Sequence, residues 1–237
     1  MAVKLDVRVY PLENPTGATK AFASFGVNDM VAVRGVRVVE DKKGLFVSMP
    51  QSRDEKNDKY HDIAFPRGEK FKLSVTKSVL DEYHKQTALP PEERGYEKPD
   101  PNAINSIDVE AVKLDIDIYP ISDPQGKTLA FAKLTVDDLV TIRGIRVVDN
   151  DEEGKFVSMP QTQDKYLKYH NVAFAISTDL SDKISECILD KFENPEKTVD
   201  RKPSLGEKLA AGATKAAEHT APVMPAAAKT RNPGVLE

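Results

Sequence analysis

The chain of 237 residues is 40% hydrophobic and 30% charged, and its longest apolar runs are far shorter than the ~20 residues of a membrane helix, which indicates a globular protein without a membrane span. The single cysteine excludes an internal disulfide, and the chain starts directly in strand-like sequence without a secretory leader, so we expect a cytoplasmic protein. The formal net charge of -4 argues weakly against nucleic acid as a partner, because phosphate binding usually shows as a basic surface.

Short strands are predicted first along the chain. Between residues 3 and 10 hydrophobic and polar side chains alternate, which is typical of a half-buried strand, and Pro11 ends it. Asn28-Asp29 is predicted to form a short hairpin connection. The predicted strands cover residues 3–10, 21–27, 30–39, 45–49 and 60–64.

A helix is predicted from Lys70, where the spacing of hydrophobic residues changes. They recur at every fourth position, and two leucines widen the same arc. We expect this arc to lie on the sheet. It consists of Phe71, Val75, Val79 and Tyr83, with Leu73 and Leu80 beside them.

The chain contains this pattern twice. Residues 3–40 align without a gap on residues 112–149, with 20 of 38 pairs identical. The second helix keeps the same arc as Leu180, Ile184, Ile188 and Phe192, with Leu189 in the position of Leu80. A period near 109 residues is domain-sized. We therefore predict two similar α+β domains, each an antiparallel sheet of about five strands with one C-terminal helix.

The predicted boundaries follow from the repeat and from a change in composition. A proline-rich, charged linker separates the two copies, and a low-complexity tail follows the second. A capping box at Ser204–Glu207 predicts a short helix to about His219, and we expect disorder beyond Pro222. The segments are domain one at 1–87, the linker at 88–109, domain two at 110–199 and the tail at 200–237.

Three segments of the first copy resemble consecutive signature blocks of the SpoVG (stage V sporulation protein G, septation protein) family. They are Gly44–Pro50, Tyr60–Pro66 and Val79–Tyr83. The resemblance covers roughly residues 3–85, and more weakly 112–192. It implies a small sheet with a C-terminal helix, dimerisation through strands, and DNA and RNA binding in bacterial regulation of sporulation and division. Since known members are mostly single domains, we expect the two copies to pair within the chain as a pseudo-dimer, with a homo-oligomer as the alternative.

The resemblance also implies basic contacts in the loop after Met-Pro and around the terminal helix. In the first copy these residues are Arg53, Lys56 and Lys59 in the loop, and Lys70, Lys77 and Lys85 on the helix. The other interpretation of the helix lysines is a solvated surface, which Asp81 among them favours.

The second copy has lost most of these charges. Gln163 replaces Arg53, and the helix lysines correspond to Asp179, Glu186 and Asn194. Residues 1–87 contain 15 Lys and Arg against 12 Asp and Glu, whereas residues 110–199 contain 11 against 17. We therefore predict that the first copy contacts nucleic acid and that the second completes the scaffold.

Two further sets of residues have open interpretations. The strand arginines Arg34 and Arg37 recur as Arg143 and Arg146, and they could contact phosphate or pair with carboxylates at a sheet edge. Phe22 and Phe131 could stack on bases, although core packing or a dimer seam is the commoner role of a strand aromatic.

Enzymatic activity is disfavoured. His61 and His170 occupy matching positions, but the sequence around them shows no nucleophile or oxyanion site, and it has no metal-ligand spacing or phosphate-binding glycine loop. We expect no catalytic residues, no metal and no cofactor. The main hypothesis is a DNA- or RNA-binding regulator, and the alternative is a protein-interaction module in which the acidic second copy and the tail recruit a partner.

Overall fold

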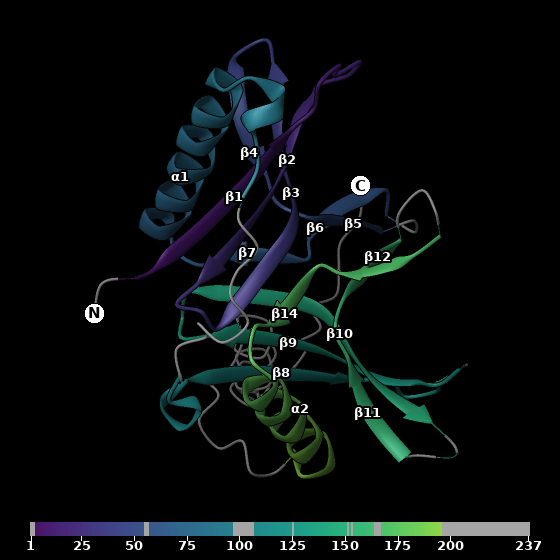
Figure 1. Ribbon diagram of the computed structural model, residues 1–237. Helices are drawn as coiled ribbons and strands as arrows, with labels where there is room; N and C mark the ends of the chain where they lie inside the picture. The colour runs from purple at the N-terminus through teal and green to yellow at the C-terminus, as the bar shows by residue number, and fades with distance from the viewer. Residues whose placement is uncertain are drawn as a thin grey trace, which may run out of the picture. The chain divides into compact units, whose positions relative to one another are not determined.

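The computed structural model describes residues 3–54, 57–96, 107–124, 126–150, 152, 154–163 and 167–195. Predictions that concern Lys56, the middle of the linker and the whole tail lie outside these residues. Within them, a series of strands is followed by one long helix in each copy, in the same order, which confirms the predicted α+β class (Figure 1). The predicted domain boundaries stay predictions.

The two copies contain matching elements. In the first copy they are β1 (Leu5–Pro11), β2 (Thr19–Val27), β3 (Val31–Asp41), β4 (Gly44–Ser48), β5 (Gln51–Asp54), β6 (Lys59–Asp62), β7 (Ala64–Pro66) and α1 (Glu69–Ala88). In the second they are β8 (Leu114–Pro120), β9 (Thr128–Val136), β10 (Val140–Asn150), β11 (Gly154–Ser158), β12 (Gln161–Gln163), β13 (Tyr169–Asn171), β14 (Ala173–Ala175) and α2 (Thr178–Glu193). There are also two short 3-10 helices: η1 (Pro91–Glu93) lies in the predicted linker, and η2 (Val109–Ala111) crosses from its last residue into the predicted second domain.

The hairpin between β2 and β3 turns at Asn28 and Asp29, as the sequence predicts. Both residues have positive φ, at 50° and 55°, a backbone conformation that Asn and Asp adopt more readily than most residues. Asn28 Oδ1 also accepts a hydrogen bond from the backbone N–H of Lys4 at 2.8 Å. Asp137 and Asp138 repeat the conformation in the second copy.

A β-bulge interrupts the longest strand of each copy, β3 at Arg34-Gly35 and β10 at Arg143-Gly144. The pairing with the preceding strand shifts register at these points. Gly35 and Gly144 have φ of 76° and 74°, where a side chain would be strained. Because the bulge adds one residue, Arg34 and Arg37 both lie on the outward side of the sheet although they are three positions apart.

The two copies exchange a short strand. β14 of the second copy pairs antiparallel with β3, with Phe174 opposite Ala32, and β7 of the first copy pairs antiparallel with β10, with Phe65 opposite Thr141. Each five-stranded sheet therefore contains four strands of one copy and one of the other. The predicted count of about five strands is confirmed for each sheet, but the sequence did not reveal that one of them comes from the other copy.

The region predicted as a fifth strand at 60–64 is divided in the structure. β6 pairs with β5 in a separate two-stranded hairpin, whereas β7 joins the sheet of the second copy. Ile63 lies between them, and its N–H donates to Pro50 O at 2.8 Å. The prediction of one strand was wrong because the chain changes partner there, and the loop expected after Met-Pro is this β5–β6 hairpin.

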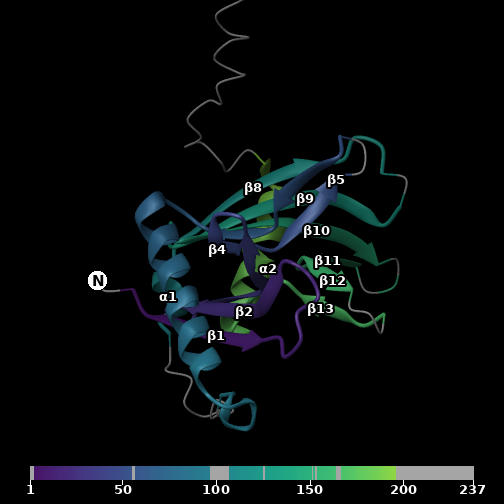
Figure 2. The ribbon, with the colours of Figure 1, turned by 90° about the horizontal axis from the view of Figure 1, so that it is seen from above.

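Each helix covers the inner face of its sheet (Figure 2). In α1, Val75 and Val79 are fully buried, and in α2 the predicted arc is buried at Leu180, Ile184 and Ile188. The prediction that Leu73 widens the buried arc is wrong, because its side chain is 65% exposed. At 100° per residue, Leu73 lies about 140° round the helix from the midpoint of Val75 and Val79.

The buried side chains of both copies form one continuous hydrophobic cluster. The start of the predicted linker also packs on the first copy. Tyr96 Oη accepts a hydrogen bond from the N–H of Val9 at 2.7 Å and donates to Glu82 Oε1 at 2.9 Å. Tyr96 therefore covers backbone groups at the edge strand β1 and ties that strand to α1.

Candidate nucleic-acid interface

The lysines predicted as contacts on the first helix are exposed in the structure. Lys70, Lys77 and Lys85 lie on the side of α1 that faces away from the sheet, with exposed Asp81 among them. Lys85 Nζ lies 3.6 Å from Glu82 Oε2; the lysine side chain is 70% exposed and that of Glu82 is 17% exposed. Among the described residues Lys70 and Lys77 form no ion pair. Two of the three lysines are therefore available to an anionic ligand.

The cations predicted after Met-Pro lie on the β5–β6 hairpin, apart from the helix lysines. Arg53 Nε and Nη2 donate to Asp58 Oδ1 at 3.0 and 2.8 Å, and both side chains are more than half exposed. Lys59 is exposed on the opposite strand. Lys56 lies outside the described residues. Arg53 and Lys59 are accessible, although a ligand must compete with Asp58 for Arg53.

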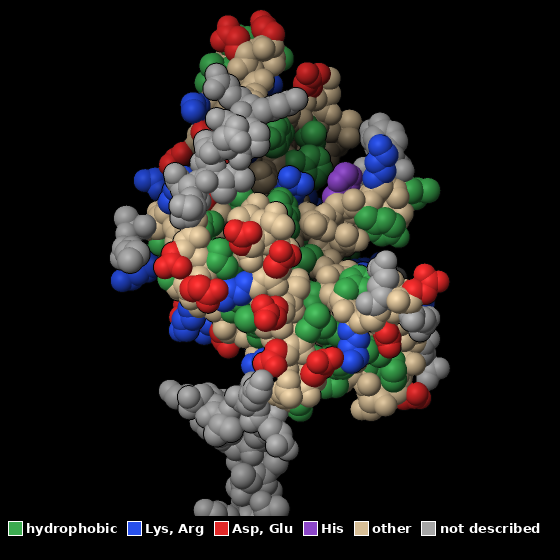
Figure 3. Space-filling view, turned by 60° about the horizontal axis from the view of Figure 1, so that its bottom comes forward, with side chains coloured by type: hydrophobic (Ala, Val, Ile, Leu, Met, Phe, Trp, Pro, Cys, Tyr) green, Lys and Arg blue, Asp and Glu red, His purple; other side chains and the backbone are tan. Residues whose placement is uncertain are grey.

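The corresponding helix of the second copy is acidic on its exposed side. Asp179 and Glu186, which replace Lys70 and Lys77, are both exposed on α2. Asp and Glu side chains, with Lys and Arg side chains among them, are distributed over the face that Figure 3 turns forward. A polyanion would be repelled by such a surface.

The outward face of the first sheet carries an aromatic residue beside an arginine. Cross-strand pairing aligns Tyr10 of β1, Phe22 of β2, Arg37 of β3 and Ser48 of β4 in one row. Tyr10 is 50% exposed and Phe22 is 49% exposed, so Phe22 is not a core residue. Arg37 Nη2 donates to the Ser48 hydroxyl at 3.4 Å.

The second sheet repeats this row with the same residue types: Tyr119, Phe131, Arg146 and Ser158. Tyr119 and Phe131 are 50% and 45% exposed, and Arg146 Nη2 donates to the Ser158 hydroxyl at 3.2 Å. The two tyrosines were not among the predicted site residues. The period-2 alternation that places Tyr10 with Arg8 on the polar face of β1 is the signal that could have identified them.

The bulge arginines lie where the two copies exchange strands. The Arg143 guanidinium lies 4.9 Å from the ring centre of Phe65, and that of Arg34 lies 4.6 Å from the ring centre of Phe174. Backbone hydrogen bonds from Arg143 N to Ile63 O and from Arg34 N to Val172 O, both 2.7 Å, hold the bulges against the exchanged strands.

None of the four strand arginines forms an ion pair within the described part of the chain. The sequence left two interpretations open, phosphate contact and pairing with carboxylates. The described residues give no support for the pairing with carboxylates. Arg34 and Arg143 lie instead over aromatic rings, and Arg37 and Arg146 donate to serine hydroxyls.

Two clefts meet at Arg143. The first, of ≈ 340 Å³, is lined by Ser52, His61 and Asp62 from the first copy and by Arg143, Arg146 and Tyr169 from the second, among others. The second, of ≈ 540 Å³, shares His61, Asp62 and Arg143 and is also lined by Tyr60 and by Lys72 of α1. Both clefts are composite, because each needs residues of both copies.

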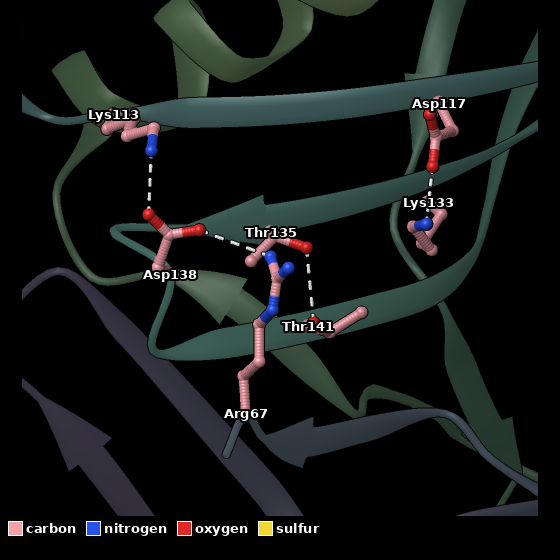
Figure 4. A network of polar contacts seen from close by, with 7 residues as sticks. All are labelled: Arg67, Lys113, Asp117, Lys133, Thr135, Asp138 and Thr141. Atoms are coloured by element: carbon pink, nitrogen blue, oxygen red, sulfur yellow. Dashed lines mark hydrogen bonds and ion pairs between the residues drawn. The ribbon is translucent and has the colours of Figure 1, made fainter. Parts of the chain in front are cut away.

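A polar network at one end of the second sheet also joins the copies (Figure 4). Asp138 accepts from Lys113 Nζ at 2.7 Å and from Arg67 Nη1 of the first copy at 3.1 Å. The hydrogen bond and charge of Lys113 hold the pKa of Asp138 below its ordinary value. In the same view the hydroxyl oxygens of Thr135 and Thr141, both buried, lie 3.1 Å apart. Of these contacts, the one between Arg67 and Asp138 connects the two copies.

Two further groups with reactive side chains, His61 and Cys187, lie in different surroundings. His61 lines both clefts, and Cys187 packs partly buried against the core, where burial raises the pKa of its thiol. The described residues contain no group of three or more His, Cys, Asp and Glu side chains placed to hold a metal ion. No helix in the described part of the chain is long and apolar enough to cross a membrane.

Comparison with known proteins gives one consistent result. The family model described as SpoVG matches residues 1–85 and 112–194. A "Putative septation protein SpoVG" of Treponema denticola is 35% identical over 88 residues, which cover 37% of this chain and 92% of the relative. Proteins of the same name from Archaeoglobus fulgidus and Heliobacterium modesticaldum are 36% and 39% identical, with 36% and 35% of this chain and 99% and 91% of the relative covered.

Proposed function

Because the chain belongs to the SpoVG family, we propose that it is a cytoplasmic, non-enzymatic regulatory protein that binds DNA or RNA in septation- or sporulation-type control. The names of its relatives, which are called septation proteins, support the septation role. The phosphate contacts are assigned to the first copy, on the solvent side of α1 and on the β5–β6 hairpin.

The exposed lysines of α1 are the observation that carries this proposal. Lys70 and Lys77 form no ion pair among the described residues, so no such pair has to break before they bind a phosphate. Lysines that neutralise phosphates release condensed counterions, which makes the affinity fall steeply with salt concentration. The acidic surface of α2 supports the assignment to the first copy.

The test compares two double variants of the full chain, because strand exchange argues against isolating either copy. Lys70→Glu with Lys77→Glu should weaken binding to DNA or RNA and make log affinity depend less steeply on log salt, by up to about one unit per lost phosphate contact. Lys42→Glu with Lys43→Glu changes the net charge equally on the exposed turn before β4, and it should leave binding nearly unchanged. Equal losses in both variants, or none in the first, would contradict the assignment.

The second candidate function is a protein-interaction module, favoured by the exposed acidic side of α2. A partner protein held mainly by apolar contacts would show little dependence on salt. Sequencing the nucleic acid that copurifies with the chain would separate the two functions and identify the target. A preparation without bound nucleic acid, together with no binding by the purified chain, would favour the interaction module.

A further inference from the structure

We propose that the junction between the copies and the outward face of the second sheet form one track for single-stranded nucleic acid. Phe131 and Tyr119 stack on bases, while Arg146, Arg143 and Lys72 contact phosphates. The inference rests on the proposed function and deepens it, since it selects single strands and assigns contacts to the second copy. The sequence predicted only a scaffold role for that copy, on the basis of its acidic helix, and the track lies on a different surface.

The aromatic residues have the exposure that base stacking requires. Phe131 and Tyr119 lie on neighbouring strands in register, and each leaves about half of its surface to solvent. Phe156 of β11, one strand beyond Arg146, is 45% exposed. Exposed rings on a sheet bind bases of any sequence, because every base has a π-face. Bases within a duplex are stacked on one another and cannot reach such rings, so the surface selects single strands.

The cations continue from this row into the clefts. Arg146 is the register neighbour of Phe131 and also lines the first cleft. Arg143 lines both clefts, and Lys72 lines the second. A sugar-phosphate backbone that follows the track would thus meet Arg146, Arg143 and Lys72 in that order. Each of these side chains lacks an ion-pair partner among the described residues.

The residues that line the clefts include one carboxylate, which would repel a bound phosphate. Asp62 lines both of them, and its Oδ1 accepts a hydrogen bond from Gln51 Nε2 at 2.8 Å. His61 lies beside it in both linings. Three cations face this one carboxylate, so the clefts keep a net positive charge that suits a phosphate chain.

The equivalent junction at Arg34 is a poorer site although its row has the same residue types. Ser181 takes the place of Lys72, so one cation is missing. Tyr96 packs edge-on against Tyr10 with the ring centres 5.5 Å apart, so Tyr10 already has an aromatic partner within the chain. The structure therefore offers a matched pair of positions, Phe131 on the track and Phe22 off it.

The test measures fluorescence anisotropy of labelled single strands of about 20 nucleotides and mixed sequence, as DNA and as RNA, with the matching duplexes. Phe131→Ala should weaken single-strand binding by about five-fold or more, and Phe22→Ala should change it less than about two-fold. Arg146→Gln should lower the salt dependence by about 0.7 per lost phosphate contact. Thermal melts should show that the variants are folded. Photocrosslinking with bromouracil-substituted strands should attach peptides that contain Phe131 or Tyr119.

Each outcome decides the proposal. If the wild-type chain binds neither the single strands nor the duplexes, the proposed function and the track fail together. If it binds, and Lys70→Glu with Lys77→Glu weakens binding while Phe131→Ala and Arg146→Gln do not, only the track is wrong. Equal losses for Phe131→Ala and Phe22→Ala, equal affinity for duplexes, or crosslinks confined to α1 would also overturn it.

Discussion

At the scale of single residues, Tyr96 shows how one side chain organises the start of the linker. Its hydroxyl group contacts the backbone of Val9 and the carboxylate of Glu82. Burial, followed by the hydrogen bond to Glu82, raises the pKa of Tyr96 to about 12. Although burial alone would raise the pKa of Glu82, hydrogen bonds from Gln86 and Tyr96 lower it.

This raised pKa predicts a pH dependence. A folded-state pKa above the unfolded value means that the contribution of Tyr96 to stability is complete below the ordinary tyrosine pKa of 10.0 and is lost as the pH rises towards about 12. Of the seven tyrosines, Tyr96 should ionise late in an absorbance titration of the folded chain. Tyr96→Phe should remove that late step and lower the stability near neutral pH. If the late step is still present in the titration of Tyr96→Phe, it belongs to another tyrosine.

At the scale of elements, the two helices show what periodicity predicts well and what it misses. Spacing alone identified the buried arc of α2 and most of that of α1, because a helix on a sheet buries one stripe. Spacing placed Leu73 wrongly, because the predicted arc was wider than the part of α1 that the sheet covers at this position. It also missed the bulges, although a glycine inside a valine-rich strand is their known signal.

Leu180 and Leu73 give a matched test of the helix packing. Leu180 is fully buried and Leu73 is 65% exposed. Leu180→Ala should lower the free energy of unfolding by about 2–5 kcal/mol, because it leaves a cavity in the core. Leu73→Ala should change it by less than about 0.5 kcal/mol. Urea denaturation followed by circular dichroism measures both, and similar losses would mean that Leu73 is covered in solution.

At the scale of the whole molecule, strand exchange is the feature that the sequence could not reveal. β7 and β14 have three residues each, too few for a periodic signal, and nothing in Ala64–Pro66 indicates which sheet it joins. The repeat predicted two similar folds. Of the row Tyr10–Phe22–Arg37, the sequence identified Phe22 and Arg37 as possible contacts but not Tyr10. The composite clefts depend on the exchange, so no pattern within one copy could predict them.

We propose that the exchange occurs within one chain in solution, so that a single polypeptide builds the clefts at Arg143. The alternative is exchange between two chains, which would form the same clefts in a dimer of twice the 26.2 kDa mass. Phe174 lies opposite Ala32 in the exchanged pair, and the Cα atoms of directly opposed antiparallel residues lie about 4.5–5.5 Å apart, within the range that a disulfide spans.

Disulfide trapping of this pair tests the account most directly. The chain would carry Ala32→Cys and Phe174→Cys in a Cys187→Ala background, with each single cysteine variant as control, and would be oxidised at low concentration before non-reducing electrophoresis. We predict a cross-linked monomer that migrates faster than its reduced form. A disulfide-linked dimer as the main product, or no cross-link in the folded chain, would contradict intramolecular exchange.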